Sequence, residues 1–402
     1  MITYDKALYY VLSQSLLLSA EKVSLENAVN RNAAQDVFCD FPIPHFNNSA
    51  MDGYAIRSVD TKSAADTVPV IFSVFGHLQA GGVEQFYGAH SSIKIMTGAC
   101  VPDGYDAVIP VELVNTLSQG KISISQAMQS GQNIRYQGED FSKGNSVIEK
   151  GMKILPQHIM ALAACGLNKI SVFRKIIVGI ITTGKELKNS SSKLDGNTIY
   201  NSNGPYLNAK LKNLGCEVID FGIVPDDVDY FKSILQEKHK VDCFISTGAV
   251  SMGDHDFIPT AIESVGGEIL FHKVAIRPGK PILFARLGKI PFFGLPGNPI
   301  STAVGFSFFV EPFLNAVTQQ NRDVLVKAEL DSIYKKKHEL CQFLKAFCYV
   351  DNSSGCLKVK ILNDQESFKI RSFSQSNCWA ILNEGKKDYV VGDKVCVKYI
   401  EN

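Results

Sequence analysis

Acidic and hydroxyl side chains follow a short apolar run in the middle of the chain. Residues 241–245 have the length and composition of a buried strand in a parallel sheet. The loop after them is rich in small polar residues, and Asp254 and Asp256 then precede an apolar helical pattern. A loop between a strand end and a helix start offers free backbone N–H groups to an anion.

Two interpretations of this loop are open. The aspartates could cap the helix, or they could hold a hard cation beside a bound anion. One aspartate alone favours capping, but two aspartates with several hydroxyls and glycines favour a ligand site. The hydroxyl and glycine residues of the loop are Ser246, Thr247, Gly248, Ser251 and Gly253.

Polar loops also follow other apolar runs, in the segments TTGKEL, VPDD and LPGNPIS. The carboxyl ends of parallel strands meet at one edge of a sheet, so Glu186 and Asp226 are expected to face the same crevice as Asp254 and Asp256. Each acid alone is typical of a solvated turn. Together they predict a magnesium–phosphate site, because Mg²⁺ takes one or two carboxylates plus phosphate oxygens.

The segment HKVAIRPGKP carries Lys273, Arg277 and Lys280. Lys273 and Arg277 are four residues apart in a strand-like segment, which predicts that they point to the same face. Pro278 and Pro281 stiffen the turn, and a fixed cationic cluster suits an oxyanion. The alternative is a solvated strand face. The chain contains neither GxGxxG nor GxxxxGK[ST], so no dinucleotide fingerprint or Walker loop is expected.

The elements that must position these residues alternate between strand and helix from residue 175 to about 320. This alternation predicts a parallel sheet with helices on both faces. One predicted helix covers SNGPYLNAKLKNLG, with Ser202 as its N-cap and Gly215 at its end. From residue 321 the segments LKVKIL, FKIRSF and KVCVKYI alternate with period two and predict a small C-terminal β domain.

The N-terminal third predicts a different arrangement. Residues 1–40 are expected to be largely helical, beginning with an amphipathic helix rather than a signal peptide. Asp52-Gly53 has the composition of a hairpin turn. Four apolar runs between residues 68 and 125 predict a β-rich module, and Pro156 opens another helix. The helical segments on either side are expected to pack together, which makes the β module an insertion.

Composition limits the class of protein. The 402 residues predict two to four domains, and 45% hydrophobic with 20% charged residues is ordinary for a globular chain. A net charge of +1 without a basic run makes nucleic acid an unexpected partner. Ten cysteines without a CxxC pair favour reduced thiols in the cytoplasm. No uninterrupted apolar run approaches the ~20 residues of a membrane span, so no membrane association is expected.

Several of these segments carry a family resemblance. FNNSAMDGYAIR, IMTGACVPDGYDAVIPVE, TTGKEL, STGAVSMGDHD, RPGKP and GLPGNPIS, in this order and spacing, resemble the MoeA-type molybdopterin molybdenumtransferases and the related E domain of gephyrin. The resemblance is strong over residues 1–315. It implies a multidomain α/β protein with domain I at 1–45 and 141–173, a β-rich inserted domain II at 46–140, a parallel-sheet molybdopterin-binding domain III at 174–320, and a small C-terminal β domain IV at 321–402.

The resemblance also implies a reaction and an assembly. Molybdate is inserted into the dithiolene of adenylylated molybdopterin with Mg²⁺, and AMP is released. The protein is expected to be a cytoplasmic, elongated homodimer whose active site is shared between subunits, and to meet other proteins of molybdenum cofactor biosynthesis.

Residue roles carry over by position. The family's essential acids, expected to be both catalytic and metal-binding, fall on Asp52, Glu186, Asp226 and Asp256, and its important threonine falls on Thr97. Substrate contacts are expected from Thr247, Gly248, Ser251, Gly253, Asp254, Lys273, Arg277, Lys280, Pro296 and Pro299, and from Ser367 in QESFKI. Three positions depart from the family pattern: Lys185 stands in place of an acid, Ala249 in place of a glycine, and QFLK in place of an arginine-bearing segment.

Two other functions are weighed against the transferase. One is a non-catalytic molybdopterin-binding scaffold of the gephyrin E type. The other is a Mg²⁺-dependent nucleotide pyrophosphatase. The presence of all four mapped acids favours catalysis over scaffolding.

Overall fold

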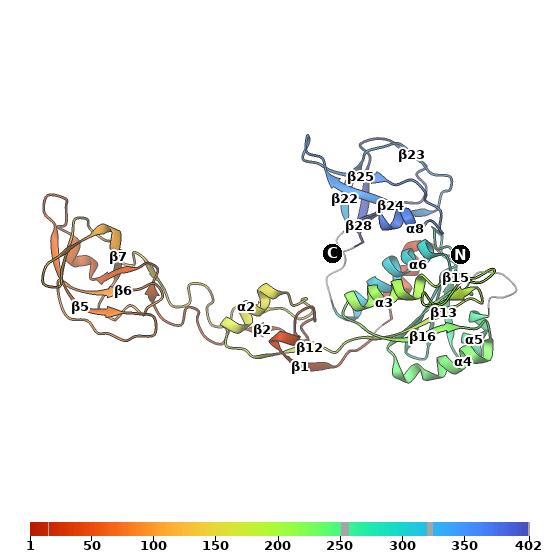
Figure 1. The fold of residues 1–402 in the computed structure, drawn as a ribbon, viewed down its shortest axis with the longest axis horizontal. Coiled ribbons are helices and arrows are strands. Elements are labelled where there is room, and N and C mark those ends of the chain that lie inside the picture. The colour runs from red at the N-terminus through yellow and green to blue at the C-terminus, as the bar shows by residue number, and fades with distance from the viewer. Residues whose placement is uncertain (15, 251–256, 320–324, 401–402) are drawn as a thin grey trace.

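The chain begins in an α/β domain, passes through a small linking unit into a separate β-rich module, and then returns to the α/β domain and a C-terminal barrel. The computed structural model of the protein describes residues 1–14, 16–250, 257–319 and 325–400. The β module lies at one end of an elongated molecule, a small linking unit lies in the middle, and an α/β domain and a C-terminal barrel occupy the other end (Figure 1).

The first helix belongs to the α/β end of the molecule. The amphipathic helix predicted at the N-terminus is confirmed as α1 (Tyr4–Leu12), which Thr3 caps by accepting a hydrogen bond from the backbone N–H of Lys6 at 3.4 Å. Ala7 and Val11, one turn apart, are fully buried in the core of the α/β domain. The segment that follows is not helical.

The linking unit is held by two strand pairs. β1 (Ala20–Ser24) runs antiparallel to β12 (Lys169–Phe173), and β2 (Val37–Phe38) runs antiparallel to β11 (Ser146–Ile148). The prediction that residues 1–40 are helical is therefore wrong beyond α1. Pairing with β12 and β11 gives the backbone N–H and C=O groups the hydrogen bonds that a helix would otherwise provide. The helix predicted at Pro156 is confirmed as α2 (Pro156–Ala164). The β module is an insertion, but strands rather than packed helices join its two ends.

The β module contains a sheet of order β7-β4-β6-β5-β9-β8. Its strands are β4 (Gly53–Ile56), β5 (Val70–Leu78), β6 (Ser91–Ile95), β7 (Ala107–Pro110), β8 (Val114–Leu117) and β9 (Lys121–Ile124), with β3 (Asn48–Ser49) and β10 (Ile134–Arg135) paired beside it. The predicted β-rich module is thus confirmed. The predicted hairpin turn at Gly53 is wrong: Gly53 begins β4, and a Cβ there would lie 2.0 Å from the carbonyl oxygen of Ile109 on β7.

The α/β domain is built on a six-stranded sheet of order β16-β13-β17-β21-β20-β18. Its strands are β13 (Ile177–Thr183), β16 (Glu217–Val224), β17 (Cys243–Thr247), β18 (Glu268–His272), β20 (Leu283–Leu287) and β21 (Ile290–Leu295). The first four strands in spatial order are parallel as predicted, whereas β20 runs antiparallel to both of its neighbours, β21 and β18. A two-residue turn joins β20 to β21, and so short a connection permits only antiparallel pairing.

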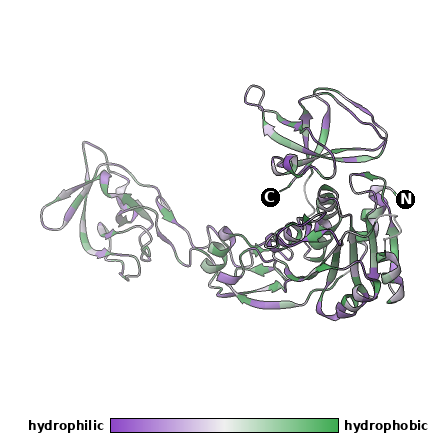
Figure 2. Cartoon of the chain, turned by 45° about the vertical axis from the view of Figure 1, so that its right-hand side comes forward, coloured by the Kyte–Doolittle hydropathy of each residue, from purple (hydrophilic) through white to green (hydrophobic). Residues whose placement is uncertain are grey.

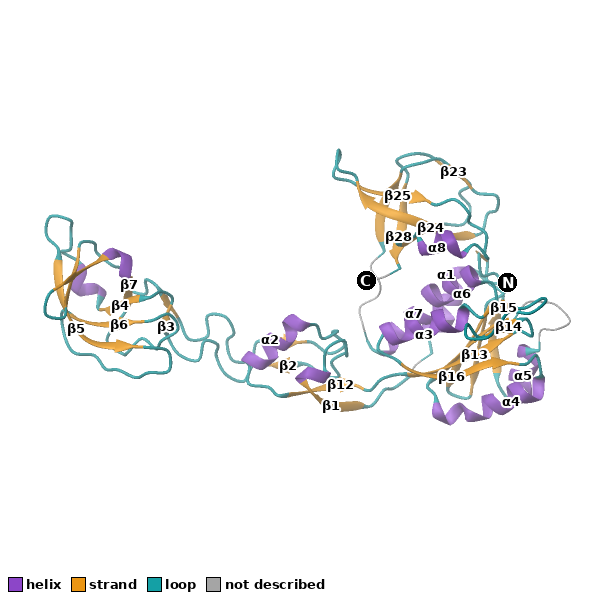
Figure 3. Ribbon diagram, in the orientation of Figure 1, coloured by secondary structure: helices purple, strands orange, loops and turns teal. Residues whose placement is uncertain are grey.

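Helices cover both faces of this sheet, as predicted (Figure 3). α1, α3 (Asn203–Asn213) and the long helix that starts at α6 (Pro299–Gly305) share one core, while α4 (Val228–Gln236) and α5 (Ile258–Ser264) share the other. The apolar residues between these layers colour most of the strands green in Figure 2. Ser202 occupies the N-cap of α3 but makes no capping bond; the side chain of Asn201 accepts from Gly204 N–H instead, at 3.0 Å.

The long helix continues from α6 through a π-helical turn, η5 (Phe306–Val310), into α7 (Glu311–Val317). At 19 residues it is long and apolar enough to cross a membrane, although Glu311 interrupts its apolar run. In the described residues it is the one helix of this kind, and 78% of its apolar window is buried inside the protein. It is therefore placed as a core helix of the α/β domain.

The C-terminal barrel has the strand order β19-β24-β25-β22-β28-β26, and an additional pairing of β24 with β26 closes it. Its elements are β19 (Ile276–Arg277), β22 (Val326–Leu330), β24 (Cys341–Val350), β25 (Leu357–Ile361), β26 (Cys378–Leu382), β28 (Lys394–Tyr399) and the short helix α8 (Ile370–Ser374), with β23 (Tyr334–Lys335) and β27 (Asp388–Tyr389) forming a side ribbon. The predicted β domain is confirmed, but the strand predicted at FKIRSF is wrong, because most of that segment lies in α8.

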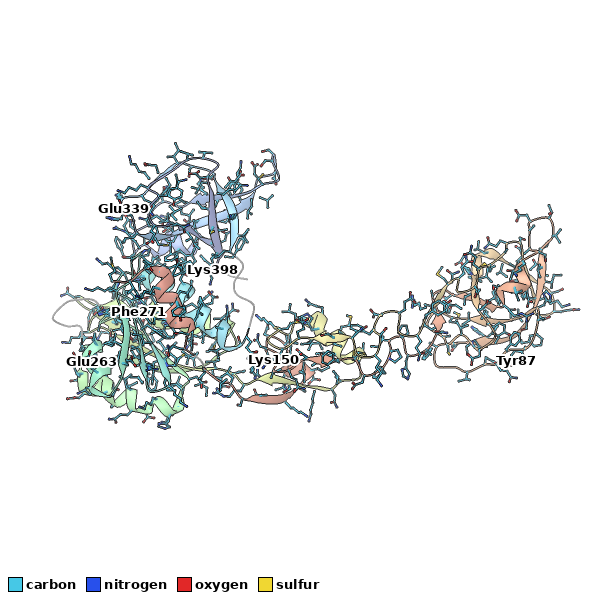
Figure 4. The ribbon with its side chains drawn as sticks, turned by 180° about the vertical axis from the view of Figure 1, so that it is seen from behind. Tyr87, Lys150, Glu263, Phe271, Glu339 and Lys398 are labelled. Atoms are coloured by element: carbon cyan, nitrogen blue, oxygen red, sulfur yellow. The ribbon has the colours of Figure 1, made fainter. Side chains whose placement is uncertain are left out.

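Buried polar contacts fix the barrel on the α/β domain. The ammonium of Lys398 lies 2.8 Å from a carboxylate oxygen of Glu311 and donates to the carbonyl oxygen of Ser307 at 2.8 Å. The indole N–H of Trp379 donates to the Ser307 hydroxyl at 3.3 Å. Figure 4 labels Lys398 where the two domains meet. Removing one partner of such a buried ion pair is strongly destabilising, so the barrel is held in one orientation.

Candidate active site

The polar loops at the carboxyl ends of β13, β17 and β21 surround a cavity of about 780 Å³, here called the strand-end pocket. Acidic, glycine and hydroxyl residues line it on the α/β side, and apolar residues line its rim. Among its lining residues are Thr183, Gly184, Glu186, Tyr200, Asn203, Asp226, Thr247, Gly248, Ala249, Gly297, Asn298, Pro299, Phe368 and Ile370. The sequence prediction that these strand ends share one crevice is consistent with this arrangement.

Side-chain hydrogen bonds tie the three strand ends together. The amide of Asn203 on α3 donates to the Thr247 hydroxyl at 2.8 Å and to the carbonyl oxygen of Gly297 at 2.7 Å. The Thr183 hydroxyl donates to the carbonyl oxygen of Thr247 at 3.2 Å. Asn203 is 8% exposed and Thr247 is 1% exposed, so these bonds are shielded from water. The floor of the pocket is therefore rigid before any ligand arrives.

Backbone conformation explains the small residues of the floor. Gly248 has φ of 96°, and a Cβ there would lie 2.5 Å from the carbonyl oxygen of Thr183. Ala249, which departs from the family pattern, has φ of 49° in the left-handed region that favours glycine. The alanine thus adopts the backbone conformation that a glycine would adopt more easily.

The structure brings together some of the predicted acids and separates others. Glu186 and Asp226 both line the strand-end pocket, and the Glu186 carboxylate lies directly against Gly184. Asp52 lies in the β module instead. Ser251, Gly253, Asp254 and Asp256 lie outside the described residues. Within the described ranges no group of three or more Asp, Glu, His or Cys is placed to hold a metal ion.

Glu186 and Asp226 still fit Mg²⁺ in one specific way. Mg²⁺ is held in proteins by one or two carboxylates, and substrate phosphate oxygens and water complete its octahedron. A pocket with two carboxylates and the exposed backbone of a glycine loop supplies that set only when a phosphorylated ligand is present. The donors therefore suit a metal that arrives with a phosphate group.

Asp52 and Thr97 form a unit of their own on the β module. The Thr97 backbone N–H and hydroxyl both donate to Oδ1 of Asp52, at 2.7 Å and 2.8 Å. These two hydrogen bonds, the backbone one first, hold the pKa of Asp52 below its ordinary value. Both side chains are exposed. Within one chain this carboxylate directly precedes β4 of the β module, and that module lies at the opposite end of the molecule from the α/β domain that holds the strand-end pocket (Figure 1).

A second cavity of about 670 Å³, here called the cationic pocket, lies between the RPGKP loop and the C-terminal barrel. Its basic residues are Arg277, Lys280, Lys335, Lys337 and His338, and its neutral polar residues are Ser301, Tyr334, Gln342, Gln365 and Ser367. Glu366 is the single carboxylate among the described lining residues. So much positive charge facing one cavity favours an anionic ligand.

The cations of this pocket differ from the predicted cluster. Lys273 lines neither cavity: β18 ends at His272, Lys273 has φ of 75°, and Arg277 belongs to β19, which pairs with β24 of the barrel. The prediction that Lys273 and Arg277 share a face is therefore wrong, because the segment is two strands of different sheets. Arg277 donates from Nη1 to Nε2 of His338, and this nitrogen must accept because a guanidinium has no acceptor.

Sequence analysis missed Lys335, Lys337 and His338. They stand in YKKKHEL, which is a short basic run, so the expectation of a chain without one is wrong. Lys336 in the same run is 3% exposed and donates to the carbonyl oxygen of Asn383. Burial of Lys336 fixes the segment so that its neighbours on both sides face the cavity.

The two pockets share a wall. Asn298 and Pro299 line the strand-end pocket, and Ser301, on the same first turn of α6, lines the cationic pocket. On the barrel side, Ser367 lines the cationic pocket and Phe368 lines the strand-end pocket. The backbone N–H of Ile300 donates to the carbonyl oxygen of Ser367 at 2.9 Å and joins the two halves of the wall. Pro296 lines neither cavity, but its carbonyl oxygen accepts from the Thr302 hydroxyl at 2.6 Å.

The lysine of QFLK supports this wall rather than the cationic pocket. Lys345 is 0% exposed, and its ammonium donates to the carbonyl oxygens of Asp364 at 2.5 Å, Lys369 at 3.0 Å and Glu366 at 3.3 Å. Burial lowers the pKa of Lys345, and three carbonyl acceptors offset part of that cost. These bonds also explain why the predicted strand at FKIRSF does not form: an ammonium, not a neighbouring strand, satisfies the carbonyls before α8.

Comparison with known proteins decides the family. Residues 2–166 match the MoeA N-terminal region (domain I and II), residues 179–316 match a probable molybdopterin binding domain, and residues 327–400 match the MoeA C-terminal region (domain IV). The molybdopterin molybdenumtransferase of Haemophilus influenzae is 34% identical over 99% of this chain and 98% of its own length. The chain belongs to the molybdopterin molybdenumtransferase family.

Other relatives of the molybdopterin molybdenumtransferase family agree. The enzyme of that name from Synechococcus elongatus is 36% identical over 99% of both chains. The crystal structure of a molybdopterin biosynthesis MoeA protein from Pyrococcus horikoshii superposes with a TM-score of 0.85 at 30% identity, over 99% of this chain and 100% of that one. The protein is therefore a transferase of molybdenum cofactor biosynthesis, and the predicted multidomain fold is confirmed.

Proposed function

We propose that the protein inserts molybdate into the dithiolene of adenylylated molybdopterin, with Mg²⁺, and releases AMP. The observation that carries the proposal is the shared wall of residues 298–301 and 367–368 between two pockets of different chemistry. One pocket suits a phosphorylated organic molecule with a hard cation, and the other suits an oxyanion. The shared wall makes the two pockets neighbours, so the proposal places the two substrates in adjacent cavities.

The strand-end pocket is assigned to the organic substrate. The loop at Thr247 and Gly248 can lie against the end of β13 because Gly248 has no Cβ, which would otherwise clash with the Thr183 carbonyl. Glu186 and Asp226 would hold Mg²⁺ together with the phosphate oxygens of the substrate. When bound, Mg²⁺ neutralises charge on the phosphoanhydride and on the departing AMP. The rigid Asn203 bonds keep the floor in place while the substrate is bound.

The cationic pocket is assigned to molybdate. Molybdate is a dianion, and Arg277 and Lys280 offer charge-assisted hydrogen bonds of ~1.5–3 kcal/mol each. Ser301 and Ser367 line the same cavity, and their hydroxyls would add neutral donors. His338 accepts from Arg277 and so restricts where the guanidinium points. Lys335 and Lys337 raise the local concentration of the anion before it binds.

A second subunit completes the proposed site. Asp52, held ionised by Thr97, directly precedes β4 of the β module, and that module lies too far from the α/β domain for Asp52 to act in its own strand-end pocket (Figure 1). In a closed two-fold dimer the same surface of each copy serves the other, so one Asp52 reaches each pocket. The dimer therefore contains two active sites, each made by both subunits. The free state of all ten cysteines is compatible with a reducing cytoplasm, where other proteins of cofactor biosynthesis would deliver the substrate.

The test is molybdate-dependent AMP release by the purified protein. With adenylylated molybdopterin, Mg²⁺ and molybdate, the wild type should release AMP, and Glu186→Gln and Asp226→Asn should release far less. An exposed acid outside both pockets, Glu263→Gln, serves as the matched control. Release that is independent of molybdate would identify a nucleotide pyrophosphatase, and binding without release would identify a scaffold; either result contradicts the proposal.

A further inference from the structure

Phe368 combines exposure with a fixed position at the rim of the strand-end pocket. Its side chain is 62% exposed, although it lines the cavity together with Ile370, which is 45% exposed. An exposed large aromatic ring next to a binding cavity has apolar surface that a flat ligand can cover. Both residues come from the C-terminal barrel, whereas the floor of the pocket comes from the α/β domain.

The backbone that carries Phe368 is held on both sides. Before it, the carbonyl oxygen of Ser367 accepts from Ile300 N–H at 2.9 Å. After it, the carbonyl oxygen of Lys369 accepts from the buried Lys345 ammonium at 3.0 Å and from the Ser372 hydroxyl at 3.2 Å. The ring is thus exposed on a segment that is not free to move away, which reduces the entropy lost when a ligand covers it.

One face of the ring already has a partner. The ammonium of Lys369 lies 5.7 Å from the ring centroid and 3.7 Å from Oδ1 of Asp364. The cation is therefore shared between a carboxylate and the π face. Because the side chain is 62% exposed, the ring also has uncovered surface for a second planar group.

We infer that Phe368 is a substrate-binding residue whose ring stacks on the planar nitrogen heterocycle of the organic substrate. The inference rests on the proposed function, because that substrate carries two such heterocycles, the pterin and the adenine. Base–aromatic stacking tolerates different heterocycles, since each has a π face. The barrel would then contribute to both pockets through adjacent residues, Ser367 toward the oxyanion and Phe368 toward the ring.

The test compares Phe368→Leu, which keeps apolar bulk but removes the π face, with the wild type. AMP and molybdopterin are titrated separately by calorimetry, so that the ring that stacks is identified. We expect Phe368→Leu to weaken binding of one of them by about tenfold, within the range for aromatic–base stacking. The matched control is Phe347→Leu, an exposed phenylalanine of β24 that lines neither pocket and should bind both ligands normally.

Phe368→Trp supplies a readout that a structural role would not give. The sequence contains one tryptophan, Trp379, which is 0% exposed, so a new exposed indole dominates any change in emission. The ligand that stacks should quench this emission while its affinity stays near the wild-type value. If Phe368→Leu binds both ligands like the wild type, or if bound ligand leaves the Phe368→Trp emission unchanged, the inference is wrong. Molybdate-dependent AMP release by the wild type, measured in parallel, tests the proposed function separately.

Discussion

Arg277→Ala should raise the molybdate concentration needed for half-maximal AMP release. Arg277 reaches the cationic pocket from β19, where the RPGKP loop meets the barrel. A hydrogen bond to a charged group contributes ~1.5–3 kcal/mol, and an exposed guanidinium is expected at the lower end of that range. Because ~1.4 kcal/mol is a factor of ten, the requirement should rise by about tenfold.

The assay is AMP release at saturating adenylylated molybdopterin over a range of molybdate concentrations. Lys280→Ala should behave similarly, and the double variant should lose less than the sum, because both cations contact one anion. Lys289→Ala, an exposed lysine on the turn between β20 and β21, is the matched control and should leave the molybdate requirement unchanged. If Arg277→Ala instead weakens binding of the organic substrate with an unchanged molybdate requirement, the assignment of the two pockets is wrong.

Three further predictions test other parts of the structure. Mixing inactive Asp52→Asn with inactive Glu186→Gln should restore roughly a quarter of wild-type activity through heterodimers with one intact site; no recovery after proven subunit exchange would contradict a shared site. Gly53→Ala should lower the melting temperature of the β module by an amount equivalent to roughly 1–3 kcal/mol, because its Cβ would lie 2.0 Å from a β7 carbonyl oxygen; calorimetry that shows an unchanged transition would refute the packing. Thr97→Val removes one of the donors that lower the pKa of Asp52, so the pKa should rise and the acid limb of the pH–rate profile should move to higher pH; an unmoved limb would show that Asp52 does not control it.

Parts of the site that depend on local sequence were predictable. Glu186, Asp226 and Gly248 each follow an apolar strand directly, and the rule that ligands bind at the carboxyl ends of parallel strands needs no tertiary information. Gly248 could also be expected to approach a ligand, because a loop after a buried strand often requires a residue without Cβ. These residues are predictable because the strand that positions each of them lies only a few residues before it in the sequence.

Parts that depend on distant pairing were not predictable. β1 has a polar composition, and only its pairing with β12, almost 150 residues away, makes it a strand. Lys335, Lys337 and His338 reach the cationic pocket because the barrel places their segment opposite the RPGKP loop. Lys273 was assigned to the pocket because sequence spacing cannot show that β18 and β19 belong to different sheets. In each case the structure depends on a contact between two distant segments, and neither segment's sequence indicates that it pairs with the other.

The central claim is that molybdate and the organic substrate bind in adjacent pockets and react with each other, and the stoichiometry of a single turnover tests it most directly. Purified protein is loaded with a known amount of adenylylated molybdopterin, mixed with Mg²⁺ and excess molybdate, and quenched. AMP and pterin-bound molybdenum are then measured in the same sample. The account predicts equal amounts of both, formed with the same time course. AMP released without molybdenum bound to the pterin would contradict it.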